Sequence, residues 1–157
     1  MTEKSESNEW YLPKSLFIKY CKLVNLRPKP DVAATKKYHL CEYYFTEEDD
    51  ALKQEWLIKA GTKKTGIWVN PPLKRMMTKK FVNKACQQWI KHNLNILMII
   101  PTGVISRKYF RNIWKLFKRG YFVDIIPIDR PHFIHNGEIG DQARNDYILL
   151  VFRKRYI

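Results

Sequence analysis

A short apolar run that ends in an asparagine and two prolines constrains the fold of this chain most strongly. The run Gly66-Ile67-Trp68-Val69 is followed directly by Asn70-Pro71-Pro72. A continuous stretch of β-branched and aromatic residues is typical of a strand that is buried on both faces of a parallel sheet. Proline has no backbone N–H to donate to a neighbouring strand, so the strand has to end before Pro71. The pattern therefore places Asn70 at the carboxyl end of a central strand, where open α/β sheets bind their ligands.

The segment Asn70-Pro71-Pro72 suits one chemical task, the methylation of an exocyclic amine such as N6 of adenine. The lone pair of that nitrogen is delocalised into the ring, so the nitrogen is a poor nucleophile. The side-chain oxygen of Asn70 and the carbonyl of Pro71 could each accept one N–H and thereby localise the lone pair. An ordinary turn is the alternative interpretation, because asparagine and proline are common turn formers.

Other strands are predicted where apolar runs are bounded by turn residues. They cover residues 30–34, 94–100, 121–128 and 145–152. Asn136-Gly137 is a plausible tight turn between the last two of these strands. Strands that alternate with helices indicate a single-domain α/β fold whose sheet is mainly parallel with an antiparallel end.

Three stretches repeat apolar residues at i, i+3, i+4 and i+7, which predicts amphipathic helices. They cover residues 14–25, about 75–92 and 106–119. We expect the aromatic residues of these stripes, including Trp89 and Trp114, to lie in the core. Thr46 and Asp49 have the spacing of a capping box, which predicts a further helix from Thr46 to about Ile58.

Charge is distributed unevenly along the chain, whose formal net charge is +14 at pH 7. Residues 56–123 contain fifteen lysines and arginines and no aspartate or glutamate. A polyanion such as DNA is the natural partner of such a block, whereas a generic solvated surface would intersperse carboxylates among the cations. The cations that we expect to contact phosphates are Lys74, Arg75, Lys79, Lys80, Lys84, Arg107, Lys108 and Arg111.

Chain length and the longest apolar run limit the class of protein. The 157 residues are the size of one domain, which we expect over residues 10–157 behind a polar, disordered lead at residues 1–9. The longest apolar run, Ile96–Ile100, is far below the roughly 20 residues of a membrane span. The N-terminus also lacks the apolar core of a signal peptide. We therefore expect a soluble, cytoplasmic protein that makes no membrane contact.

The sequence gives little support for a metal site or a redox site. The three cysteines, Cys21, Cys41 and Cys86, are odd in number and unrelated in spacing, so we expect reduced core thiols. The histidines are too sparse for a zinc site, and we expect no bound metal. The acidic run Glu47–Asp50 could act as a general base or a metal cluster, or could simply favour the positive end of a helix.

The order and spacing of several motifs make the chain resemble the phage-type DNA adenine N6-methyltransferases, a compact S-adenosylmethionine-dependent family. The likeness covers about residues 9–152. The motifs are Glu9-Trp10-Tyr11-Leu12-Pro13, Asp31-Val32-Ala33-Ala34, Tyr44 to Leu52 with Trp56, Trp68 to Pro72, and Arg130 with Phe133. This resemblance implies a Rossmann-like methyltransferase fold, DNA as the substrate, S-adenosylmethionine as the cofactor, and a viral source.

The resemblance also implies roles for individual residues. Asp31, followed by Val32 and Ala33, would hold the methionine part of the cofactor. The residues that would line or shape the same pocket are Trp10, Pro13 and Asp50. Asn70 and Pro71 would orient the amine at the catalytic turn. The residues that complete this turn are Pro72 and Leu73. Arg130 would supply a basic group for DNA near the last strands.

Three positions depart from the pattern of that family. Leu12 stands where threonine is usual, Tyr38 where asparagine is usual, and Leu73 where an aromatic residue is usual. An aromatic ring at position 73 would stack on an extruded base, an interaction worth about 1 to 3 kcal/mol. The departures support an alternative hypothesis, a degenerate and non-catalytic protein of the same fold that binds nucleic acid or a partner subunit. A third hypothesis is methylation of RNA or of a protein glutamine.

Overall fold

The computed structural model describes residues 10–58 and 60–156, so the lead expected at residues 1–9 lies outside the described part. The helices are α2 (Lys14–Val24), α3 (Met77–His92) and α4 (Arg111–Lys118), with 3₁₀ turns η1 (Ala51–Lys53), η2 (Thr102–Ser106) and η3 (Lys108–Phe110). The strands are β1 (Arg27–Asp31), β2 (Tyr43–Tyr44), β3 (Thr65–Val69), β4 (Asn95–Pro101), β5 (Val123–Ile128), β6 (His132–His135), β7 (Glu138–Gln142) and β8 (Tyr147–Phe152).

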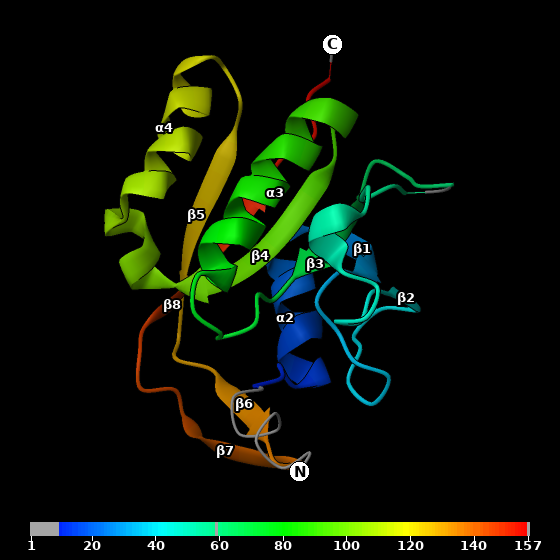
Figure 1. Cartoon of the computed structure of the whole chain (residues 1–157), viewed down its shortest axis with the longest axis vertical. Helices are drawn as coiled ribbons and strands as arrows, with labels where there is room; N and C mark the ends of the chain where they lie inside the picture. The colour runs from blue at the N-terminus through cyan, green and yellow to red at the C-terminus, as the bar shows by residue number, and fades with distance from the viewer. Residues whose placement is uncertain (1–9, 59, 157) are drawn as a thin grey trace.

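Six strands form one sheet in the order β2-β1-β3-β4-β8-β5 (Figure 1). β2, β1, β3 and β4 are mutually parallel, whereas β8 is antiparallel to both of its neighbours, β4 and β5. The prediction of a mainly parallel sheet with an antiparallel end is confirmed, and the architecture is compatible with a Rossmann-like methyltransferase fold. No helix within the described ranges is long and apolar enough to cross a membrane.

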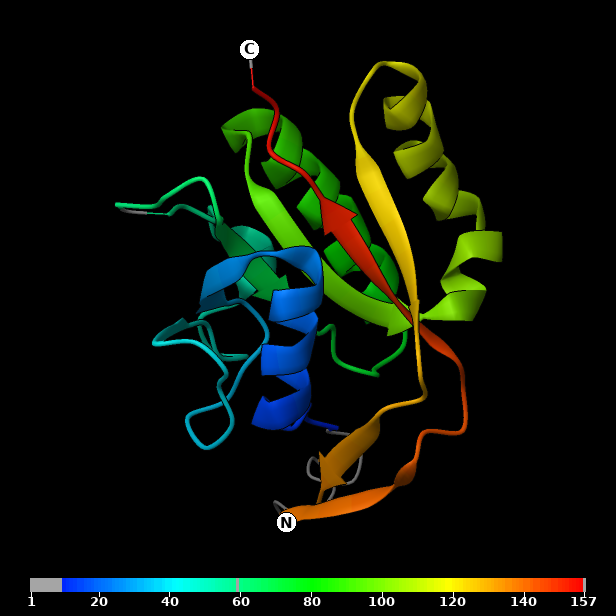
Figure 2. The same cartoon turned by 180° about the vertical axis from the view of Figure 1, so that it is seen from behind.

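Helices cover both faces of this sheet. α3 and α4 lie on the face that is nearer the viewer in Figure 1, and α2 lies on the face that Figure 2 shows. Side chains that alternate along the central strands divide accordingly. Ile67 and Val69 of β3 pack in one apolar cluster with α3 and α4, whereas Trp68 packs in the other cluster with α2. The central strand is thus buried on both faces, as its composition predicts.

The helix predicted from Thr46 to Ile58 is wrong. The carboxylate of Asp49 does accept hydrogen bonds from the backbone N–H of Thr46, at 2.8 Å, and from its hydroxyl, at 3.1 Å. However, Asp50 has a left-handed φ of 53°, and only the short turn η1 follows. The buried Trp56 then gives its backbone N–H to the side chain of Gln88 in α3, at 2.7 Å. The local capping pattern is present, but contacts with α3 hold the segment in another conformation.

The helix predicted over residues 106–119 begins later and faces differently. The two 3₁₀ turns η2 and η3 occupy residues 102–110, and α4 covers only Arg111–Lys118. Ile113 and Leu116 are the buried residues of α4, so the prediction that Trp114 lies in the core is wrong. Gly120 lies two residues beyond the end of α4 and has a φ of 85°.

The remaining elements differ from prediction mainly at their ends. β1 starts earlier than the strand predicted over residues 30–34 and stops at Asp31. Asn136-Gly137 forms the expected tight turn with φ values of 51° and 80°, but it joins β6 to β7 as a separate hairpin. This hairpin pairs with the segment just before α2, because Tyr11 and Ile134 exchange backbone hydrogen bonds at 3.0 and 2.7 Å.

Candidate functional site

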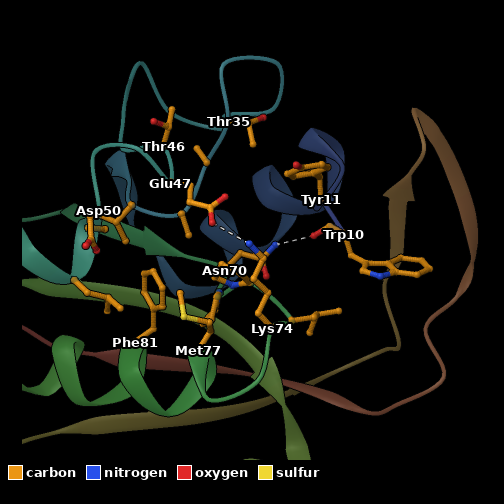
Figure 3. Close-up of a pocket in the computed structure, with 18 residues that line it drawn as sticks. Trp10, Tyr11, Thr35, Thr46, Glu47, Asp50, Asn70, Lys74, Met77 and Phe81 are labelled. Atoms are coloured by element: carbon orange, nitrogen blue, oxygen red, sulfur yellow. Dashed lines mark hydrogen bonds and ion pairs between the residues drawn. The ribbon is translucent and has the colours of Figure 1, made fainter. Parts of the chain in front are cut away.

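A cavity of about 470 Å³ lies at the carboxyl ends of β1, β2 and β3 (Figure 3). Each of these strands ends in a loop that supplies part of the wall. The residues that line the cavity are Trp10, Tyr11, Val32 to Thr35, Thr46, Glu47, Asp50 to Leu52, Asn70 to Lys74, Met77 and Phe81. Because β1, β2 and β3 are parallel, their carboxyl ends meet at one edge, as expected for the ligand site of such a sheet.

Asn70 directly follows the last residue of β3 and lies at the wall of the cavity. Its side-chain nitrogen donates to the backbone oxygen of Trp10 at 3.4 Å, a contact drawn in Figure 3. This contact uses the amide nitrogen, so the side-chain oxygen remains as the acceptor that a ligand could reach. Pro71 is buried next to it, and its missing N–H leaves only a carbonyl acceptor at that position.

Asp31 ends β1 beneath the loop that lines the cavity, and only 3% of its surface is exposed. Its two carboxylate oxygens accept the backbone N–H groups of Ala33, at 3.2 Å, and Leu40, at 3.0 Å. Burial raises the pKa of Asp31 from 3.8 to about 6, although these hydrogen bonds and the nearby His39 partly counteract the rise. The side chain therefore holds two points of the loop between β1 and β2 in place, and its degree of ionisation depends on how well it is shielded from water.

Asp31 faces a second, smaller cavity of about 160 Å³ rather than the larger one. Tyr11, Ala33 and Asn70 line both cavities, so the two spaces adjoin at these residues. The smaller cavity is also lined by Tyr38, whose ring stacks on that of Tyr11 with centroids 4.2 Å apart. A ligand in the larger cavity could therefore extend a polar end towards the Asp31 carboxylate.

The larger cavity is lined by two carboxylates and by a group of apolar side chains. Glu47 forms an ion pair with Lys74 at 2.9 Å, and Asp50 lies 3.7 Å from the ammonium of Lys53. The apolar lining residues include Val32, Ala51, Leu52, Met77 and Phe81. This arrangement can bind a ligand that combines a planar apolar group with hydroxyl or cationic groups.

Most of the residues that the sequence nominated for this site do line the larger cavity. They are Trp10, Val32, Ala33, Asp50, Asn70, Pro71, Pro72 and Leu73. Pro13 lines neither cavity, since it is buried at the start of α2, where its carbonyl accepts the N–H of Phe17 at 3.1 Å. The indole of Trp10 stacks on His135 with ring centroids 3.9 Å apart, and Figure 3 shows it turned away from the cavity.

Sequence reasoning missed several residues of the cavity wall, namely Thr35, Thr46, Glu47, Met77 and Phe81. Met77 and Phe81 lie in the first turns of α3, which starts beside the Asn70 loop. Glu47 follows β2, but this strand has only two residues and leaves no periodic pattern to detect. The sequence did single out the acidic run at residues 47–50, either as a general base or metal cluster or as a favourable helix start, but did not assign Glu47 to the cavity.

The cations nominated for DNA contact have different environments. Lys79, Lys80, Arg75, Arg107, Lys108 and Arg111 are exposed, Lys84 is half-buried, and Lys74 is paired with Glu47. Arg130 forms an ion pair with Asp146 at 2.7 Å, and this contact raises the pKa of Arg130 and lowers that of Asp146. The exposed set thus lies mainly on and around α3 and α4, whereas the charges of Lys74 and Arg130 are balanced locally.

Comparison with known proteins identifies a family and a related phage protein. A family model described as DNA N-6-adenine-methyltransferase (Dam) matches residues 1–157. A DNA N-6-adenine-methyltransferase of Escherichia phage T1 is 35% identical over 71 residues, which are 45% of this chain and 26% of the phage protein. The matched region thus spans about a quarter of the length of that relative.

Proposed function

The chain belongs to the DNA N-6-adenine-methyltransferase (Dam) family, and from this we propose that it transfers a methyl group from S-adenosylmethionine to N6 of adenine in DNA. Family membership agrees with the resemblance that the motif order indicates. The single observation that carries the proposal is the position of Asn70-Pro71 at the carboxyl end of β3, on the wall of the larger cavity.

Asn70 and Pro71 would orient the adenine amine. The contact between the Asn70 amide nitrogen and the carbonyl of Trp10 leaves the side-chain oxygen as one acceptor. The carbonyl of Pro71 is the second acceptor, so each N–H of the amine can find a partner. Two such contacts would localise the lone pair of the nitrogen and aim it into the cavity. No strongly basic side chain is required for this activation.

The residues around the two cavities fit S-adenosylmethionine by their chemistry. This cofactor supplies an electrophilic methyl group when it is bound. A volume of about 470 Å³ lies within the range of small-molecule sites. Met77 and Phe81 would pack against the planar base, and the carboxylates of Glu47 and Asp50 would accept hydrogen bonds from hydroxyl groups. Asp31, at the adjoining cavity, would face the cationic methionine end.

Adenine in a duplex has to leave the base stack before its N6 can enter a cavity of this kind. The exposed cations of α3, Lys79 and Lys80, would hold phosphates of the flanking DNA. We propose that residues 10–157 perform these tasks as one domain, inside the cell.

The test is methyl transfer by the Asn70→Ala variant on adenine-containing duplex DNA. We expect kcat to fall by about 10²- to 10³-fold, the usual loss when one pre-positioned polar contact to a reacting centre is removed. Binding of S-adenosylmethionine, measured by calorimetry, should change little. The matched control is Asn145→Ala, an exposed asparagine outside both cavities. Full activity of the Asn70→Ala variant would refute the proposed mechanism.

A non-catalytic, nucleic-acid-binding protein of the same fold is the second candidate. The observation that favours it is Leu73, which lies at the mouth of the cavity and is 46% exposed without a ring to stack on a base. Calorimetry separates the two functions. Folded protein that binds duplex DNA but gives no heat with S-adenosylmethionine would support the second candidate. Parallel methylation assays with RNA and with a glutamine peptide test the third hypothesis, in which RNA or a protein glutamine is the substrate.

A further inference from the structure

Three aromatic side chains lie on the surface at α4 and the turn that follows it, far along the chain from the cavity residues. Trp114 is 57% exposed, Phe117 is 45% exposed, and Phe122 is 58% exposed. The rings of Trp114 and Phe117 are stacked, with centroids 6.0 Å apart and an interplanar angle of 11°. Phe117 also meets Phe122 with centroids 6.3 Å apart. We call these three residues the aromatic platform.

The aromatic platform is not needed to attach α4 to the sheet. Ile113 and Leu116 are the buried residues of this helix and pack in the apolar cluster shared with α3. In Figure 1, α4 lies at one side of the molecule next to β5, which is the last strand of the sheet. The exposed rings therefore lie at an outer margin of the protein, where a partner has access to them.

Cations surround the aromatic platform, and the nearest carboxylate in the sequence, Asp124, is paired with Arg153 at 3.0 Å. The ammonium of Lys118 lies 5.8 Å from the ring centroid of Trp114. Arg111, Lys115 and Arg119 are also exposed in and just after α4. Within the described ranges, no ion pair uses any of these four cations. The partner of this surface should therefore carry both negative charge and flat apolar groups.

The basic surface continues from α4 to α3. The side chain of Asn112 in α4 donates to that of Asn83 in α3 at 3.4 Å, so the exposed faces of the two helices adjoin. Lys79 and Lys80 lie earlier in α3, which begins at the catalytic turn. A nucleic acid that lies on α3 near the cavity could therefore reach the aromatic platform.

We propose that the aromatic platform binds an unpaired strand of DNA, with bases stacked on the exposed rings and phosphates held by the cations of α4. Alternating aromatic and basic groups are the usual means of binding single strands, because every base has a flat face and every nucleotide has a phosphate. The choice of DNA rather than RNA rests on the proposed function. The stacking surface itself lies outside the cavity and does not require methyl transfer.

Charge complementarity selects DNA over a second copy of this chain. Two copies that met through the aromatic platform would place Lys115, Lys118 and Arg119 of each copy opposite the same cations of the other. Juxtaposed like charges disfavour such contacts. A strand of DNA instead supplies one negative charge per nucleotide and releases counterions when the cations bind.

The experiment measures the affinity of the full chain for a fluorescein-labelled, thymidine-only single strand of about 16 nucleotides. This probe contains no adenine, and S-adenosylmethionine is left out, so the cavity is not engaged. We expect Trp114→Leu with Phe117→Leu to raise Kd by at least about 5-fold, and by up to about 150-fold for each stacked base that is lost. Leucine keeps an apolar side chain and removes only the flat ring.

Tyr156→Leu is the matched control, because Tyr156 is an exposed ring, 67% accessible, with the ammonium of Lys63 at 5.7 Å from its centroid. It should leave Kd within about twofold, as expected for a ring outside the platform. A second variant, Lys115→Ala with Lys118→Ala, keeps both rings. Its logarithmic salt slope should be flatter by up to about 1.4, since each single-strand phosphate contact contributes about 0.7. Thermal unfolding of all variants should match that of the parent, because the altered side chains are exposed.

Three outcomes would overturn the inference. The first is unchanged strand affinity in both the leucine and the alanine double variants. The second is a dimer of the parent chain in sedimentation velocity that the leucine variant loses, with strand affinity retained. The third is binding to phosphatidylserine vesicles that needs the rings, again with strand affinity retained. If the protein transfers no methyl group, the proposed function is refuted. The Kd for the single strand still tests the present inference, because that measurement does not need methyl transfer.

Discussion

The cavity and the surface of α3 and α4 differ in charge and in burial. Three carboxylates, Asp31, Glu47 and Asp50, and three lysines, Lys14, Lys37 and Lys74, line the two cavities, and Asp31 is almost fully buried. The segment 56–123, which contains α3 and α4, has no carboxylate at all. The first region suits a small ligand that carries charges of both signs and hydroxyl groups, and the second suits a polyanion. The contrast agrees with the proposed function, in which the cavity binds the cofactor and the exposed cations of α3 and α4 hold the DNA phosphates.

The two regions also differ in how their charges affect folding. The carboxylate of Asp31 is removed from water, which opposes its ionised form and raises its pKa. The cations Lys79, Lys80 and Arg111 are exposed and keep their hydration. The buried carboxylate of Asp31 should therefore make folding sensitive to pH, while the exposed cations should make DNA binding sensitive to salt.

The largest expected effect is a loss of stability at Asp31 as pH rises. Its pKa is 3.8 in the unfolded chain and about 6 in the folded chain, so the folded state favours the protonated form. This contribution is fully present below pH 4 and is lost as pH rises through about 6. The rise in pKa corresponds to on the order of 3 kcal/mol in the free energy of unfolding. Urea denaturation between pH 4 and 7 measures it.

Asp31→Asn should flatten this pH dependence, because asparagine stays neutral throughout. The variant should be less stable overall, since its amide can accept only one of the N–H groups of Ala33 and Leu40 that Asp31 holds. Glu55 does not affect this measurement. Lys91 and His92 lower its pKa to about 2, so its ionisation changes the free energy of unfolding only below about pH 4.5. A pH dependence equal to that of the parent would show that Asp31 ionises normally.

The next effect concerns the rim of the cavity. Glu47→Gln together with Asp50→Asn removes two negative charges while keeping polar side chains, and asparagine tolerates the left-handed φ of Asp50. We expect affinity for S-adenosylmethionine to fall roughly 10- to 30-fold by calorimetry, because charged acceptors bind hydroxyl groups more strongly than neutral ones. Glu48→Gln, next to the cavity but not in its wall, should have little effect. Equal losses in both variants would mean that only net charge matters.

A smaller effect is expected for the basic surface. Lys79→Ala with Lys80→Ala should weaken duplex binding about 5- to 10-fold for all sequences and flatten the logarithmic salt slope by up to about two. Binding of S-adenosylmethionine should not change. Lys91→Ala provides the control, since Lys91 lies in the same helix but is paired with Glu55. An unchanged salt slope in the double variant would remove α3 from the DNA surface.

The smallest effect is predicted for Arg130→Ala. The guanidinium of Arg130 is paired with Asp146, so little of its charge is available to a phosphate. Duplex affinity should change by less than about twofold, which is typical of an exposed and locally paired charge. A loss as large as that of Lys79→Ala with Lys80→Ala would show that DNA displaces Asp146 and that the basic surface extends to β6.

Sequence reasoning predicted the sheet better than the segments around it. The composition of β3 indicated a strand buried on both faces, and the motif order indicated the family. The predictions failed where long-range contacts decide the conformation. Gln88 holds Trp56 in an extended segment instead of a helix, and the turns η2 and η3 shift α4 so that Trp114 faces outward. Neither effect leaves a periodic signal in the local sequence.

The site was predictable only where one short motif carries the chemistry. Asn70 and Pro71 could be placed because the prolines end a strand by covalent geometry. Glu47, Met77 and Phe81 come from two other segments, and only the parallel arrangement of β1, β2 and β3 brings those segments to one edge. Asp31 was nominated for the cofactor, but its hydrogen bonds to Ala33 and Leu40 show a role in holding the loop between β1 and β2 as well.

The position of β8 has a consequence for how the protein is made. β8 follows all the other strands along the chain, yet it fills the space between β4 and β5 in the sheet. During synthesis, β4 and β5 leave the ribosome with open edges that no earlier strand can pair, and open edges promote aggregation. β5 therefore cannot join the sheet until Phe152 has emerged, whereas β2, β1, β3 and β4 can pair before that. A nascent chain of this protein should depend on chaperones until β8 is inserted.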